Sequence, residues 1–133
     1  MAFIVDKNGN IELVQGDSGM LVVEDLPTDK DYTVYFAIQD AKRNIIGSQI
    51  STNAYSGTAP DTTRVTSVTF AITASLTDLL TVPKGEDTAE YYYGIKICNS
   101  ASPSSEDTLM INDSDIGDIN TITVYPKKVE GLA

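Results

Sequence analysis

A two-residue alternation of apolar and polar side chains runs through most of this 133-residue chain and constrains its fold more than any other feature. In residues 32–39 the apolar side chains Val34, Phe36 and Ile38 alternate with more polar neighbours. Successive side chains of a β-strand point to opposite faces, so this pattern predicts a strand with one face in a core. The same reasoning predicts strands over residues 3–5, 11–15, 20–23, 45–50, 64–73, 89–98, 109–111 and 119–125.

Turn-forming residues separate these segments at intervals that suit an all-β sandwich better than alternating strands and helices. Asn8 and Gly9 tolerate positive φ, so they predict a hairpin between residues 3–5 and 11–15. Residues 40–44 predict the turn of a second hairpin, and residues 51–63 and 99–107 read as exposed polar loops. The sequence therefore predicts one sandwich domain over residues 1–126, with an N-terminal hairpin over 1–15 and a C-terminal tail over 127–133.

One segment breaks the alternation. Ser75 can cap a helix, and Leu76, Leu79 and Leu80 fall on one helical face. We therefore expect a single short helical turn near residues 75–80 that closes one end of the core.

Charge and missing residue types exclude several kinds of function. Nineteen Asp and Glu against nine Lys and Arg give a net charge of −10, so the chain should repel nucleic acid and anionic membranes. The apolar runs are too short for a membrane span, and the first residues do not resemble a secretory signal. The chain has no His, which removes His-activated nucleophiles and His metal ligands. Its single Cys98 lies in a strand pattern and is expected to be a buried structural thiol.

Acidic side chains give the remaining candidates for site chemistry. Asp113, Asp115 and Asp118 are weak metal ligand candidates, although the spacing does not fit an EF-hand loop and a polar turn is the simpler interpretation. The pairs Glu24–Asp25 and Glu106–Asp107 are expected in solvated turns, where pKa shifts are small. We therefore expect no catalytic residue, no cofactor and no enzymatic activity.

Tyrosine gives the candidates for an interaction surface. Tyr91, Tyr92 and Tyr93 place rings on both faces of one strand, and Tyr35 and Tyr125 can join Tyr92 on the outer face. The simpler interpretation is strand propensity with cross-strand pairing. The alternative is a protein–protein contact surface, because Tyr supplies a large contact area with a polar tip. Phe3 and Val129 are further contact candidates, because chain ends can add strands to the exposed edge of a neighbour.

Strand patterns and turn placements in this order resemble the immunoglobulin-like module found at the N-terminus of tailed-phage baseplate upper proteins and of related phage head and tail fibres. The segments that carry the resemblance are QGDS at residues 15–18, YTVYFAIQD at 32–40, Asn44, VTFAIT at 68–73, LT at 76–77, YYYGIKI at 91–97 and ITVYP at 122–126. The resemblance covers about residues 11–130 and implies an antiparallel immunoglobulin-like sandwich of about seven to nine strands. In such proteins a helical or fibre region usually follows the module, whereas this chain stops at Ala133.

The resemblance implies a non-enzymatic structural protein of a bacteriophage particle: a head fibre, a capsid decoration or a baseplate component. Its expected partners are other virion proteins of the capsid or of the tail and baseplate. A homo-oligomer, such as a trimer, is expected as well. The expected location is the virion, after synthesis in the cytoplasm of the host bacterium. The alternative function is a carbohydrate-binding or adhesion module that uses exposed Tyr and Asp side chains.

Overall fold

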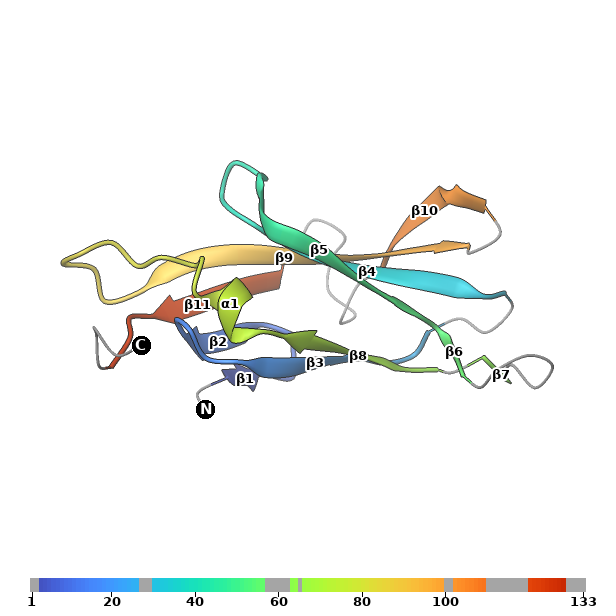
Figure 1. The fold of residues 1–133 in the computed structure, drawn as a ribbon, viewed down its shortest axis with the longest axis horizontal. Helices are drawn as coiled ribbons and strands as arrows, with labels where there is room; N and C mark the ends of the chain where they lie inside the picture. The colour runs from blue at the N-terminus through green and yellow to red at the C-terminus, as the bar shows by residue number, and fades with distance from the viewer. Residues whose placement is uncertain are drawn as a thin grey trace.

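The computed structural model describes residues 3–26, 30–56, 63–64, 66–99, 102–109 and 120–128. These residues form eleven strands and one short helix. A large sheet and a small sheet form two layers with the core between them (Figure 1). The predicted all-β sandwich is therefore confirmed.

The large sheet has seven strands. In spatial order they are β1 (Phe3–Val5), β2 (Ile11–Val14), β11 (Asn120–Tyr125), β9 (Ala89–Asn99), β4 (Tyr32–Gln39) and β5 (Ile45–Asn53), and β10 (Ser102–Leu109) also pairs with β9. The small sheet consists of β3 (Gly19–Val23) and β8 (Val68–Ile72). A separate two-strand ladder joins β6 (Tyr55–Ser56) to β7 (Thr63–Arg64).

The strand count exceeds the predicted seven to nine because two predicted loops contain strands. Over residues 51–63, β5 continues to Asn53, Ala54 is fully buried, and β6 and β7 follow. Over residues 99–107, β10 pairs with β9 and places Glu106 opposite Cys98. Polar composition signals contact with water, but a neighbouring strand can hydrogen-bond the backbone whatever the side chains are. The prediction of loops here was wrong for that reason.

One strand pair differs from the predicted antiparallel arrangement. β2 and β11 run parallel, with Ile11 opposite Ile122 and Leu13 opposite Val124. The other described pairs are antiparallel. Parallel neighbours need a long connection, and here residues 15–119 supply it. The second strand of the chain, β2, therefore lies beside the last strand, β11.

Two hairpins use the same turn chemistry. In the β1–β2 and β4–β5 turns, the carboxylates of Asp6 and Asp40 accept hydrogen bonds from the backbone N–H groups two and four residues later, at 2.8–3.0 Å. The left-handed position is Gly9 (φ 83°) in the first turn and Arg43 (φ 66°) in the second. Positive φ was predicted at Asn8 as well, and that prediction was wrong. The turn is longer than two residues, so only its last position is left-handed.

The predicted helical turn is present as α1 (Ala74–Thr77), but its details differ. Thr73, rather than Ser75, is the N-cap, and its hydroxyl accepts a hydrogen bond from the N–H of Leu76 at 3.2 Å. Leu76 and Leu80 enter the core, whereas Leu79 is 51% exposed. The helix ends after one turn, so Leu79 does not continue the face that Leu76 begins.

The core lies between the two sheets. Phe36 of β4, Tyr93 of β9 and Phe70 of β8 form its aromatic centre, and the ring centroid of Phe36 lies 5.3 Å from that of Tyr93 and 5.6 Å from that of Phe70. Around these rings lie the alternating apolar residues of β2, β3, β4, β8, β9 and β11. The same alternation that buries one face of each strand fixes which side chains remain on the outside.

Candidate functional site

The outer face of the large sheet holds the tyrosines predicted as contact residues. Tyr35, Tyr92 and Tyr125 alternate with the buried residues of β4, β9 and β11, so all three lie on the face that points away from the small sheet. Tyr35 lies opposite Lys96, whereas Tyr92 lies four positions along β9 from that residue. Tyr125 lies a further four positions from Thr121, the partner of Tyr92. At about 3.3 Å per residue, the backbones of neighbouring tyrosines in this row are separated by roughly 13 Å along the strand direction.

Each of these three hydroxyls has a partner within the chain. The Tyr92 hydroxyl lies 2.9 Å from Glu90 Oε1, and this hydrogen bond to a carboxylate raises the pKa of Tyr92 above its ordinary value. The Tyr125 hydroxyl lies 3.5 Å from Glu12 Oε1. The tyrosines therefore form a spaced row and not one cluster. Their place on a common outer face agrees with the sequence analysis, and their role as contact residues stays a prediction.

Cys98 lies on the same face of β9 as Tyr92 and is buried beside Tyr35. Cys98 is 1% exposed, and its Sγ lies 3.8 Å from the Tyr35 hydroxyl. The predicted buried structural thiol is confirmed. A thiol held in this way packs as a small apolar side chain and has little access to reagents.

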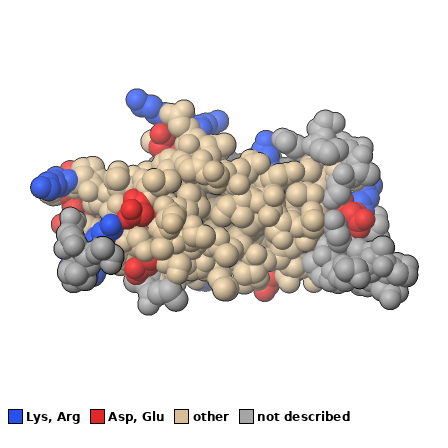
Figure 2. All heavy atoms as spheres, viewed as in Figure 1, with Lys and Arg blue, Asp and Glu red and all other residues tan. Residues whose placement is uncertain are grey.

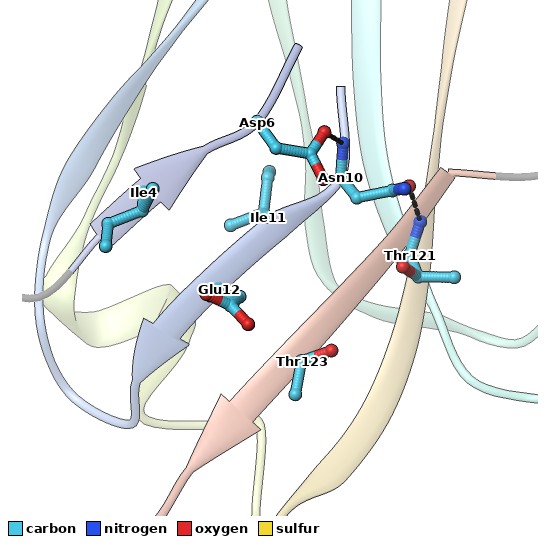
Figure 3. Close-up of a pocket in the computed structure, with 7 residues that line it drawn as sticks. All are labelled: Ile4, Asp6, Asn10, Ile11, Glu12, Thr121 and Thr123. Atoms are coloured by element: carbon cyan, nitrogen blue, oxygen red, sulfur yellow. Dashed lines mark hydrogen bonds between the residues drawn. The ribbon is translucent and has the colours of Figure 1, made fainter. Parts of the chain in front are cut away.

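A shallow depression of about 310 Å³ opens beside the tyrosine row (Figure 3). It lies over β1, β2 and β11 and is lined by Ile4, Asp6, Asn10, Ile11, Glu12, Thr121 and Thr123. Two of its polar groups stabilise the fold, since Asp6 accepts from the N–H of Asn10 at 2.9 Å and Asn10 Oδ1 accepts from the N–H of Thr121 at 3.0 Å. The sequence analysis did not predict this depression, because the strands that form it are joined only by the parallel pairing of β2 and β11.

The other shifted pKa values belong to groups that stabilise the fold. The buried hydroxyl of Tyr93 donates to the carbonyl oxygen of Gly9, and burial, with a further contribution from Asp6, raises the pKa of Tyr93 well above its ordinary value. A hydrogen bond from the backbone of Asn44 lowers the pKa of Asp40. The Tyr93 hydroxyl stabilises the β1–β2 turn against the core, and the Asp40 carboxylate stabilises the turn between β4 and β5.

Several predicted candidates lie elsewhere. Phe3 packs against the core with its ring over Gly19, so it is engaged within the chain. Glu106 and Asp107 lie in β10 rather than in the predicted turn. The remaining candidates fall outside the described residues, and they are Asp113, Asp115, Asp118 and Val129.

In the part of the chain that the structure describes, no group of three or more Cys, Asp or Glu is close enough to hold a metal ion. No helix among the same residues is long and apolar enough to cross a membrane.

Fold and surface together define an all-β sandwich with a tyrosine-bearing outer sheet face. Comparisons with protein-family models, with curated proteins and with solved structures found no match.

Proposed function

We propose that this chain is a non-enzymatic structural protein of a bacteriophage particle, an immunoglobulin-like module that docks onto capsid or tail and baseplate neighbours. The neighbour is another virion protein, and the chain reaches the particle after synthesis in the host bacterial cytoplasm. The observation that carries the proposal is the strand order of the two sheets.

That order supports an immunoglobulin-like arrangement. The neighbours β11, β9, β4 and β5 follow the G, F, C and C′ order of variable-type immunoglobulin domains, and β3 with β8 follows the B and E pair of the opposite sheet. The aromatic core between β4, β9 and β8 occupies the inter-sheet space expected of such a sandwich.

The outer face of the large sheet supports a docking role. Tyr35, Tyr92 and Tyr125 present rings along this face at regular spacing, and tyrosine is enriched where proteins meet. In a particle that carries many copies, contacts of modest strength at each copy add up through multivalency.

The test is to locate the chain in particles of a phage that encodes it. Purified particles are labelled with gold-conjugated antibody against the chain and imaged by electron microscopy, with particles that lack the gene as control. Label at a fixed position on head or tail is expected. Particles that carry no label and contain no peptide of the chain by mass spectrometry would overturn the proposal.

The carbohydrate-binding alternative has less support, because the three outer tyrosines do not converge on one spot. A glycan array separates the two functions. Binding of a defined glycan that is lost in Tyr92→Ala, together with unlabelled particles, would replace the virion role with the alternative.

A further inference from the structure

The sequence segments that form β5, α1 and β8 contain no charged residue. Residues 45–56 and 66–77 contain no Asp, Glu, Lys or Arg, although the chain as a whole carries 28 such residues. Figure 2 shows an unbroken area without charged atoms across the middle of the side on which these segments lie, with charged groups towards its ends and margins. Figure 1, drawn from the same direction, shows β5, α1 and β8 crossing this area.

Both strands on this side are edges of their sheets. β5 ends the order of the large sheet, and β8 has only β3 as a partner among the described strands. β5 is nine residues long and contains no proline and no charge. Natural proteins usually blunt a free edge with lysine, proline, a bulge or a very short strand, because its unpaired N–H and C=O groups can bind another chain. An irregularity that includes Gly47, with φ +71°, interrupts the register of β5 between Ile46 and Ile50, whereas the half that follows runs in regular register from Phe36–Ile50 to Thr33–Asn53.

The side chains of β5 suit contact with a copy of themselves. In the half of β5 with regular register, Ser51 and Asn53 are exposed. Hydroxyl and amide groups both donate and accept hydrogen bonds, so each can pair with the same group across a two-fold axis. The exposed Ile45 adds apolar area at the start of the strand.

From these observations we infer that the β5 edge is a self-association surface, on which a second copy of this chain pairs the same half of its own β5, residues 50–53, antiparallel across a two-fold axis. The hydroxyl and amide groups that can pair with themselves point to a second copy as the partner, and the charge distribution selects the surface. Two copies each carry −10, so like-charge repulsion opposes contact through charged faces and is weakest on this uncharged area. Pairing of the two edges joins both large sheets into one continuous sheet, which is an isologous interface. This inference does not rest on the proposed function.

The experiment measures the mass of the full chain by sedimentation velocity over a wide range of protein concentration. A reversible monomer–dimer equilibrium is expected. Hydrogen exchange at low and high protein concentration then locates the contact, and protection that rises with concentration is expected at the amides of residues 50–53. A chain that stays monomeric throughout, or a dimer without added protection in β5, would overturn the inference.

A matched pair of variants supplies the specific test. Gln49→Glu adds one carboxylate in the middle of β5. Asn8→Asp adds one at the tip of the β1–β2 hairpin, at the opposite end of the strand order. Both residues are exposed, and both changes are isosteric. Gln49→Glu should raise the dissociation constant about tenfold or more, since two like charges then lie on either side of the axis. Asn8→Asp should leave it within about twofold. Thermal unfolding of both variants checks that they fold. Equal effects of the two changes, or a larger effect of Asn8→Asp, would contradict the inference.

Discussion

Tyr93 joins the core to the N-terminal hairpin, and its phenol makes stability depend on alkaline pH. The ring packs against Phe36, and the hydroxyl donates to the carbonyl oxygen of Gly9. Burial keeps the phenol neutral in the folded chain, whereas in the unfolded chain it ionises near pH 10. Above that pH the folded state holds a proton that the unfolded state has lost. The free energy of unfolding contributed by this group is therefore fully present below about pH 10 and falls as the pH rises further.

The first prediction follows from this residue. Tyr93→Phe should lower the free energy of unfolding at pH 8 by about 1–2 kcal/mol, because the Gly9 carbonyl loses its partner. The decline between pH 8 and pH 11 should be shallower in the variant than in the parent. Urea unfolding at both pH values measures each quantity, and Tyr125→Phe, which removes a hydroxyl at the surface, is the control. An unchanged alkaline slope in Tyr93→Phe would contradict the assignment.

Gly47 gives the second prediction at this scale. Its φ is +71°, and an added Cβ would lie 2.6 Å from Leu76 Cδ1, where α1 packs on β5. Gly47→Ala should therefore cost about 2 kcal/mol through backbone strain and displacement of a core leucine. Gly94→Ala is the control, since an added Cβ meets nothing within 4 Å on the outer face. It should be neutral or slightly stabilising. Chemical denaturation compares the two, and equal losses would show that Gly47 is not a special position.

Among the elements, α1 has a different N-cap residue in the structure from the one that the sequence predicted. Thr73 caps α1, whereas Ser75 is exposed inside the helix. Thr73→Ala should lower the free energy of unfolding by about 1 kcal/mol. Ser75→Ala should leave it nearly unchanged or raise it slightly, because Ala is the better helix former. Thermal and urea unfolding of the two variants measure the difference, and the reverse ranking would restore Ser75 as the cap.

The elements that the sequence predicted well are those with a clear two-residue period. β4, β9 and β8 each bury the predicted alternate residues, because a packed face leaves that period in the sequence. β10 was missed because its polar residues carry no such signal, although it pairs antiparallel with β9, the strand that directly precedes it in the chain. The cap could not be predicted from residue type, because Ser and Thr are both favoured N-caps; the structure has Thr73 in this place, with Leu76 buried in the first turn.

The tyrosine positions could likewise be predicted only as far as the two-residue period determines them. The outer position of Tyr35, Tyr92 and Tyr125 could be predicted, since it is the complement of the buried face. Their spacing along the sheet could not be, because it depends on the register between strands. The depression beside β2 was also beyond prediction, as it requires the parallel pairing of β2 with β11.

For the molecule as a whole, the net charge of −10 should lower the free energy of unfolding at neutral pH. A compact chain with a charge of −10 repels itself, and the ion pair described between Lys127 and Asp78 is at the surface. Added NaCl should therefore raise the melting temperature at neutral pH by screening this repulsion. The effect should shrink towards pH 4.1, where the net charge approaches zero. Calorimetry at low and moderate salt at both pH values measures this, and a salt effect of the same size at both would contradict the electrostatic origin.

The parallel pairing of β2 with β11 also sets an order of events during synthesis. β2 leaves the ribosome early, yet its partner strand begins only at Asn120. At roughly 5–20 residues per second, the nascent chain waits several seconds for that partner. During this interval the hairpin with β1 covers one side of β2, and its other side stays open to unwanted pairing. Slower translation should therefore lengthen the time for which this side of β2 stays unpaired.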